Sequence, residues 1–165
     1  ASLLYALELP ESGGDTMLAS MYAAYDALSD TMKGMIEGLT GVHDLYHVNK
    51  FFETSGPSAA QAEVTPPVEH PVVRTHPETG RKALFINPGF TSRIVELSKS
   101  ESDALLEFLF AHATKPEFVY RHRWRLHDLL FWDNRCTIHH AVHDFAGSGF
   151  RHMHRTTVLG EAAVL

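Results

Sequence analysis

Side chains that could bind a metal and an anion gather near the C-terminal end of the sequence. Five of the twelve histidines fall between residues 139 and 154, and Arg151 and Arg155 lie among and just after the last of them. Imidazole binds iron, zinc and copper, whereas guanidinium is a permanent cation whose donors match carboxylate or sulfonate oxygens. A histidine followed shortly by two arginines therefore indicates a metal beside an anion site.

The spacing of the arginines predicts that they share a pocket. Alternate residues of a strand face the same side, so Arg151, Met153 and Arg155 point to one face while His152 and His154 point to the other. We expect the two histidines to face outward or to line a contact between subunits.

A zinc hydrolase is an alternative interpretation of the same segment. His139, His140 and His143 could hold zinc on a helix, where residues three and four apart share a face. However, β-branched Thr137 and Ile138 come directly before the histidines, and no activating glutamate accompanies them. These features favour a strand over a helix.

The elements that must position these residues are mostly strands. Alternation and β-branched content predict strands over residues 2–9, 16–19, 70–75, 83–87, 93–97, 118–124, 129–132 and 155–159. We expect the first two to pair as a hairpin, 129–132 to be buried, and a turn over 77–80 to join 70–75 to 83–87. The sequence thus predicts a mainly β, mostly antiparallel structure of the α+β class, with helices outside it.

Helical spacing appears in three places. One helix begins at Met21, and a second is capped by Ser29 or Asp30 and places Met32, Met35, Ile36 and Leu39 in the core. A third helix follows Ser98, which with Glu101 resembles a capping box.

Length and composition indicate one domain over residues 1–165. The chain has 165 residues of which 44% are hydrophobic, enough for one core and too few for two comfortable ones. Residues 49–71 contain several prolines and alanines with little periodicity, so we expect a long lid-like loop there.

Charge and cysteine usage limit the partners. The formal net charge is −6 and no long block of like charges occurs, which argues against nucleic acid and against a polybasic membrane patch. The single cysteine rules out an intrachain disulfide, and no apolar run approaches the ~20 residues that span a bilayer. We therefore expect a cytoplasmic protein that binds small molecules or other protein chains.

The histidine segment carries a resemblance to a known family. Phe131–Arg135 leading to Thr137–His139 resembles the distal-histidine motif of the taurine and 2,4-dichlorophenoxyacetate dioxygenase family. Further stretches resemble the same family in the same order: Gly13–Thr16 followed by Ala23–Tyr25, His70–Pro77 and Asn87–Ile94.

The resemblance implies a fold, a metal and a co-substrate. Members of the family are double-stranded β-helices (jelly rolls, cupin-like) that hold iron(II) with two histidines and one carboxylate and use 2-oxoglutarate and O2. It implies that His139 is the second histidine ligand. It also implies that Arg151 pairs with the distal carboxylate of 2-oxoglutarate, that the Thr16 hydroxyl assists, and that Trp132 packs near the co-substrate.

The resemblance also implies a substrate class. Arg155 aligns with the arginine that grips the substrate anion in sulfonate-using members, and Phe90 aligns with an aromatic residue of the substrate pocket. The expected reaction is hydroxylation of a small anionic molecule, taurine or another alkylsulfonate or a sulfate ester, with release of succinate, CO2 and sulfite or sulfate. Family members are commonly dimers or tetramers, so we expect a homo-oligomer.

Two of the three expected iron ligands have no counterpart in this sequence. The family supplies them as a His-x-Asp or His-x-Glu pair, and the one such spacing here, His76 with Glu78, spans the predicted turn. We expect the chain to be the C-terminal portion of a longer protein, with the missing ligands in its N-terminal part. The alternative is a non-catalytic fragment that binds an anion or a partner chain.

Overall fold

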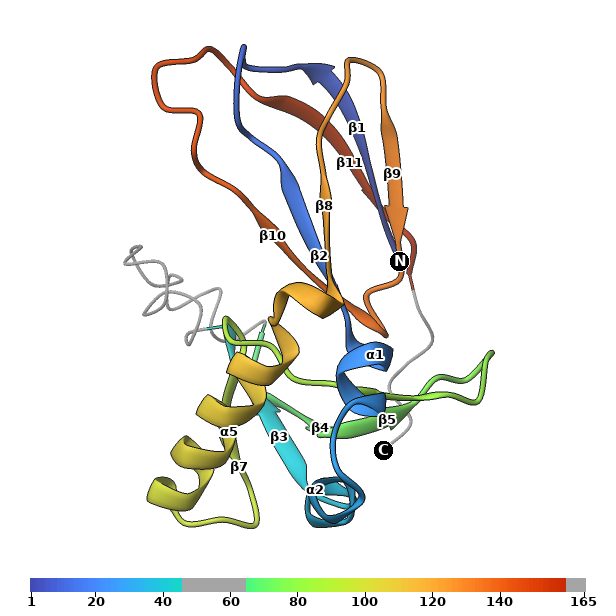
Figure 1. Cartoon of the computed structure of the whole chain (residues 1–165), viewed down its shortest axis with the longest axis vertical. Coiled ribbons are helices and arrows are strands. Elements are labelled where there is room, and N and C mark those ends of the chain that lie inside the picture. The colour runs from blue at the N-terminus through green and yellow to red at the C-terminus, as the bar shows by residue number, and fades with distance from the viewer. Residues whose placement is uncertain (46–64, 160–165) are drawn as a thin grey trace. The chain divides into compact units, whose positions relative to one another are not determined.

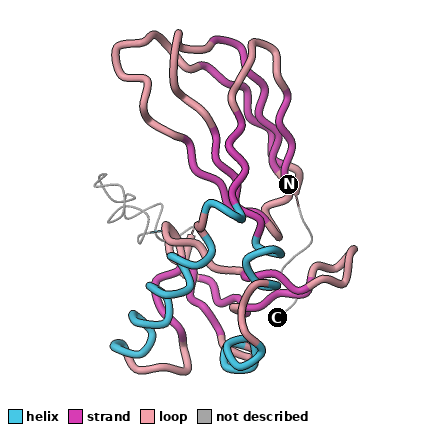
Figure 2. Tube along the Cα trace, in the orientation of Figure 1, coloured by secondary structure: helices cyan, strands magenta, loops and turns pink. Residues whose placement is uncertain are grey.

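The computed structural model describes residues 1–45 and 65–159, which are mainly β with a few helices (Figures 1 and 2). They fall into two compact units. The strand unit comprises Ala1–Met21 and Thr114–Ala162, and the mixed unit comprises Tyr22–Ala113. Two such units can belong to one domain, so the single-domain expectation stays a prediction.

The strand unit contains two three-stranded antiparallel sheets among its described residues. The first has the order β11-β1-β9, formed by His152–Thr157, Ser2–Glu8 and Leu129–Trp132. The second has the order β10-β2-β8, formed by Thr137–Ala141, Thr16–Ser20 and Val119–His122. A short 3-10 helix, Pro116–Phe118, precedes β8.

The predicted hairpin of the first two strands is wrong. Strands β1 and β2 are the central strands of different sheets, and each already has a partner along both edges. The segment between them turns through Gly13 and Gly14, both with positive φ, and carries the chain from one sheet to the other. Each of the two strands therefore pairs with strands about a hundred or more residues away in the sequence, and not with the other.

The predicted burial of residues 129–132 is wrong for half of that strand. Leu129 and Phe131 are each 61% exposed, whereas Trp132 is 6% exposed. Alternate residues of a strand face opposite sides, so only one face of β9 is turned inward. The buried residues of the strand unit include Ser2, Ala6, Thr16, Leu18, Ala19 and Met21.

The mixed unit combines helices with small sheets. Its helices are α1 (Met21–Asp26, starting at the unit boundary), α2 (Asp30–Ile36) and α5 (Lys99–Ala113). One sheet has the order β4-β3-β7, formed by Val68–Pro71, Thr40–His43 and Thr91–Ile94, and β5 (Val73–Thr75) pairs with β6 (Lys82–Leu84). None of the described helices is long and apolar enough to cross a membrane.

The helix starts predicted from capping residues are confirmed. The Ser29 side chain accepts a hydrogen bond from the Met32 N–H (3.2 Å), and Glu101 Oε2 accepts one from the Ser98 N–H (2.9 Å). The predicted core position of Met35 is wrong, because its side chain is 57% exposed. In the same helix, Ile36 is fully buried.

The strand predicted over residues 70–75 is divided at Val72. The Val72 N–H donates to the Leu39 carbonyl (2.8 Å), whereas the Val72 carbonyl accepts from the Phe85 N–H (2.7 Å). The backbone therefore changes partners at this fully buried residue, so that β4 and β5 belong to different sheets. The predicted loop over 49–71 lies mostly outside the described residues, and its last four residues form β4.

The turn predicted over residues 77–80 is confirmed. The Gly80 N–H donates to the His76 carbonyl (2.9 Å), and β5 pairs with β6 on either side of the turn. His76 Nδ1 accepts hydrogen bonds from the backbone N–H groups of Glu78 and Thr79 (3.3 Å each). His76 and Glu78 thus help to build a hairpin turn.

His43 provides a testable property of the mixed unit. Its ring stacks on Phe85 (centroids 5.3 Å apart) and meets the edge of His70 (5.0 Å), and Nε2 lies 3.2 Å from the Phe85 carbonyl. Burial, followed by repulsion from His70, lowers the pKa of His43 from 6.5 to about 4. The folded state therefore holds His43 neutral where an unfolded chain would protonate it.

We expect the His43 ring to titrate by NMR with a midpoint near pH 4. Because the folded pKa is depressed, the contribution of His43 to stability is complete above pH 6.5 and is lost as the pH falls from 6.5 through 4. A His43→Asn variant should show a shallower loss of unfolding free energy over that window. A midpoint near 6.5 in the folded protein would contradict the burial argument.

Candidate functional site

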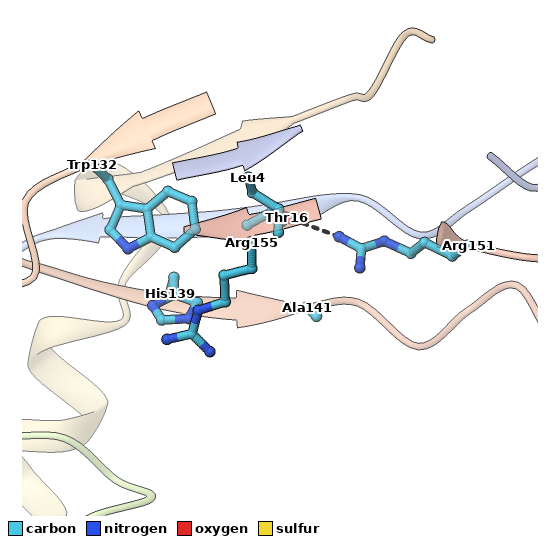
Figure 3. A pocket seen from close by; sticks show the side chains of 7 residues that line it. All are labelled: Leu4, Thr16, Trp132, His139, Ala141, Arg151 and Arg155. Carbon is cyan, nitrogen blue, oxygen red and sulfur yellow. Dashed lines mark hydrogen bonds between the residues drawn. The ribbon is translucent and has the colours of Figure 1, made fainter. Parts of the chain in front are cut away.

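A pocket of about 150 Å³ lies in the strand unit. Residues from both sheets and from the segment just before β11 line it (Figure 3): Leu4, Thr16, Trp132, His139, Ala141, Arg151 and Arg155. Its side chains are two guanidinium groups, an imidazole, an indole, a hydroxyl and two aliphatic groups. The combination suits an anion beside a metal-ligating nitrogen.

Strand register explains why these residues meet. Leu4 on β1 lies opposite Arg155 on β11, and Thr16 on β2 lies opposite Ala141 on β10. Directly opposed residues of neighbouring strands share a face. His139 precedes Ala141 by two positions, so the two side chains share a face of the second sheet. In each sheet, the residues that line the pocket therefore lie on one face.

The guanidinium of Arg151 is held by the start of β2. Arg151 Nε donates to the Gly14 carbonyl (2.8 Å), and Nη2 donates to the Thr16 hydroxyl (3.2 Å). The guanidinium carbon lies 5.9 Å from the centroid of the Trp124 ring. Burial lowers the pKa of Arg151 from its usual value, but arginine remains a cation in proteins. Its remaining N–H groups have no partner among the described residues and suit an anion.

The turn before β2 is fixed by a second, acidic set of contacts. The Gly14 N–H donates to Asp144 Oδ1 (2.8 Å), and this bond is the largest cause that lowers the pKa of Asp144. Arg121 spans both acids, with Nε 2.6 Å from Asp15 Oδ2 and Nη2 3.3 Å from Asp144 Oδ2. A Cβ atom at Gly13 would lie 2.8 Å from the backbone carbonyl oxygen of Asp144, which cannot rotate away, so a side chain there would displace the backbone.

His139 lies at the pocket wall beside Trp132, with ring centroids 4.9 Å apart. Its partial removal from water, followed by the charges of Arg155 and His140, lowers its pKa. The neutral imidazole that binds metals is therefore favoured at neutral pH.

The geometry argues against the zinc interpretation. His139 and His140 are consecutive residues of strand β10, opposite Leu18 and Met17 of β2, so their side chains point to opposite faces. The helix that would bring His139, His140 and His143 together is absent from this described segment.

Trp132 is fixed by its indole nitrogen. Nε1 donates to Asn134 Oδ1 (2.8 Å), and Asn134 Nδ2 donates to the hydroxyl of the fully buried Ser2 (2.8 Å). These two bonds fix the indole at the pocket wall, where it can pack against a bound molecule.

Five of the six predicted site residues line this one pocket, namely Thr16, Trp132, His139, Arg151 and Arg155. Phe90 is not among the lining residues. It belongs to the mixed unit, in the turn before β7, where its side chain is 40% exposed. Its backbone carbonyl accepts a hydrogen bond from the Asp44 N–H (2.8 Å). The individual roles of the six residues stay predictions.

Leu4 and Ala141, which line the pocket, were not predicted from the sequence, and neither were two residues that support the pocket from behind its lining. The Gly14 carbonyl binds Arg151, and Trp124 Nε1 donates to the Thr16 hydroxyl (3.0 Å). Alternation over 118–124 places Trp124 on the same side as His122, and His122 lies opposite Thr16 in the register of β2 and β8. The pairing of β2 with β8, which are distant in the sequence, brings Trp124 to Thr16, and local sequence patterns do not reveal such pairing.

The fold and the pocket define a mainly β protein in which two arginines and a histidine of the metal-binding type line one pocket. The sequence model described as "Taurine catabolism dioxygenase TauD, TfdA family" matches residues 1–157. The chain therefore belongs to this family of alpha-ketoglutarate-dependent dioxygenases.

Individual relatives agree with the family. The 2,4-dichlorophenoxyacetate dioxygenase of Cupriavidus pinatubonensis is 42% identical over 163 residues, which cover 99% of this chain and 56% of that protein. The sulfonate dioxygenase of Saccharomyces cerevisiae is 34% identical, with coverage of 96% and 38%. A solved structure of AAD-2 with Mn(II) and N-oxalylglycine superimposes with a TM-score of 0.90 at 40% identity, covering 99% of this chain and 64% of that one. The chain thus spans about half the length of the curated relatives it matches.

Gly14 and Gly147 offer a matched test of how the turn holds Arg151. Both have positive φ, but a Cβ at Gly14 would lie 3.0 Å from Arg151 Cδ, whereas nothing described lies within 4 Å at Gly147. We expect Gly147→Ala to lower the free energy of unfolding by about 1–2 kcal/mol, the cost of a left-handed L-residue. Gly14→Ala should lower it by about 2–4 kcal/mol, because it also displaces Arg151. Urea denaturation measures both, and equal losses would show that the Arg151 contact does not depend on Gly14.

Proposed function

We propose that the protein containing this chain is an iron(II)- and 2-oxoglutarate-dependent dioxygenase that hydroxylates a small anionic organic molecule. We further propose that the two sheets of the strand unit belong to a double-stranded β-helix. The observation that carries the proposal is the pocket, which combines the Arg151–Thr16 pair with His139 and Arg155.

The Arg151–Thr16 pair fits a carboxylate of 2-oxoglutarate. An ionised carboxylate only accepts hydrogen bonds, and guanidinium only donates them. Arg151 is already oriented by Gly14 and Thr16, so little further ordering is needed when the anion binds. Placement of the carboxylate against a charged donor in a half-buried site gives a strong, directional contact.

His139 fits a metal ligand, although the pocket does not complete a metal site. It is the one metal-ligating side chain among the described residues that line the pocket, and none of the lining residues is a carboxylate. We propose that the other ligands come from residues outside this lining. Bound iron(II) with 2-oxoglutarate would supply oxidation by O2 that yields succinate and CO2.

Arg155 fits the anionic end of the substrate. It lines the same pocket on the same strand face as the Arg151 side chain, opposite Leu4. We propose an alkylsulfonate such as taurine, a sulfate ester or an aryloxyacetate, whose hydroxylation next to sulfur or oxygen releases sulfite, sulfate or an alcohol. The names of the two curated relatives support an aryloxyacetate and a sulfonate as candidates.

A non-catalytic anion-binding role is the second candidate, because the described pocket contains one metal-ligating side chain. Iron dependence separates the two functions, since an anion-binding module would retain affinity for dicarboxylates without producing succinate. A cytoplasmic location and assembly as a dimer or tetramer remain predictions.

Succinate formation tests the proposed enzyme. We expect the full-length natural protein to produce succinate from 2-oxoglutarate only with iron(II) and O2, and faster with a sulfonate, sulfate ester or aryloxyacetate. A protein that binds 2-oxoglutarate but forms no succinate with any of these compounds would instead be an anion-binding module.

Steady-state kinetics of two variants should distinguish the roles of the two arginines. Arg151→Lys should raise the KM for 2-oxoglutarate by about 10- to 100-fold, because a lysine cannot reproduce the paired donors of guanidinium. Arg155→Lys should instead raise the KM for the substrate and leave that for 2-oxoglutarate within about twofold. If both variants change the same KM, the division of the pocket between the two anions is wrong.

A further inference from the structure

The Thr16 hydroxyl is surrounded by donors. Trp124 Nε1 donates to Thr16 Oγ1 at 3.0 Å, and Arg151 Nη2 donates to the same oxygen at 3.2 Å. Thr16 is 2% exposed, so its side chain is buried apart from the part that lines the pocket. Both contacts come from residues more than a hundred positions away, and each depends on the strand arrangement.

The number of lone pairs fixes what this hydroxyl can still do. A threonine hydroxyl has two acceptor lone pairs and one O–H donor. The two donors occupy both lone pairs, and the hydroxyl proton meets no acceptor among the described residues. Thr16 lines the pocket, so the group that remains to be satisfied is an O–H donor at the pocket wall.

We infer that Trp124 is a positioning residue that turns the Thr16 hydroxyl into a donor for a carboxylate bound at Arg151. The inference rests on the proposed function, because the carboxylate is that of 2-oxoglutarate. Without the indole N–H, one lone pair of Thr16 is free and the hydroxyl can rotate. It then gains alternative partners, including water, and the site loses part of its preference for a group that only accepts hydrogen bonds.

Trp124 contacts both members of the anion site. Besides its bond to Thr16, its ring lies 5.9 Å from the Arg151 guanidinium carbon and meets the His122 ring edge to face at 4.5 Å. Phenylalanine at this position keeps an aromatic face for Arg151 and removes the N–H donor. Trp124→Phe therefore isolates the hydrogen bond from the ring contact.

A double-mutant cycle tests the inference by equilibrium binding. Binding of 2-oxoglutarate to the full-length protein with Mn(II) in place of iron is measured by calorimetry for wild type, Trp124→Phe, Thr16→Val and the double variant. We expect Trp124→Phe to weaken binding about three- to tenfold, the value of one hydrogen bond. In the Thr16→Val background it should weaken binding by less than about twofold, because the hydroxyl on which it acts is gone.

Kinetics and a conservative variant distinguish positioning from general damage. Trp124→Phe should raise the KM for 2-oxoglutarate and leave the KM for the substrate unchanged, and Thr16→Ser, which retains the hydroxyl, should bind like wild type. In the metal-free protein, exchange of the Trp124 indole proton with water should be faster in Thr16→Val than in Thr16→Ser. This NMR measurement needs neither metal nor co-substrate.

The outcomes separate the inference from the proposed function. The inference would be overturned if Trp124→Phe and Thr16→Val had additive effects on the affinity for 2-oxoglutarate, or if Trp124→Phe left that affinity unchanged. In either case, binding of 2-oxoglutarate by the wild type would leave the proposed function intact. Absence of 2-oxoglutarate binding in the wild type would overturn both. If Trp124→Phe does not fold, the NMR shift of the Trp124 indole proton on addition of 2-oxoglutarate is measured instead. A shift in wild type and Thr16→Ser, but not in Thr16→Val, supports the inference. An equal shift in all three proteins overturns it.

Discussion

The contact between the Arg151 guanidinium and the start of β2 is the constraint on which the pocket depends. Arg151 lies directly before β11 of the first sheet. Gly14 lies in the turn before β2 of the second sheet and Thr16 is the first residue of β2, so these two hydrogen bonds join the sheets where the anion would bind. A cation partly removed from water needs compensating acceptors. The Gly14 carbonyl supplies one only because the backbone approaches the arginine closely, with no side chain between them.

The acidic contacts around this turn act on geometry more than on stability. Arg121 is 46% exposed, and ion pairs at such positions contribute little free energy because water screens them. Their effect is to fix two neighbouring groups, since Asp144 binds the Gly14 N–H while Arg121 binds both Asp15 and Asp144. The orientation of Arg151 therefore depends on a turn whose backbone is fixed by Asp144 and Arg121.

The sequence predicted local features well and long-range pairing poorly. Period-two alternation placed Arg151 and Arg155 on one face, and capping residues located helix starts, because both depend on a few neighbouring residues. The hairpin of the first two strands failed because their partners are distant in sequence, and Trp124 was missed for the same reason. The role of His139 came from the family resemblance, since spacing alone left zinc and iron both open.

The placement of the two arginines bears on how the pocket would orient two reactants at once. They are four residues apart on one extended face, which puts their Cα atoms about 13 Å apart. On the proposed function, one carboxylate of 2-oxoglutarate at Arg151 and the anionic group of the substrate at Arg155 would be held apart, which weakens their mutual repulsion. The rest of both molecules, which includes the second carboxylate of 2-oxoglutarate, would then extend into the part of the pocket lined by Leu4, Trp132 and His139. Anchoring of the anionic group of the substrate at Arg155 would keep that group away from the metal and leave the carbon skeleton to occupy the space beside His139.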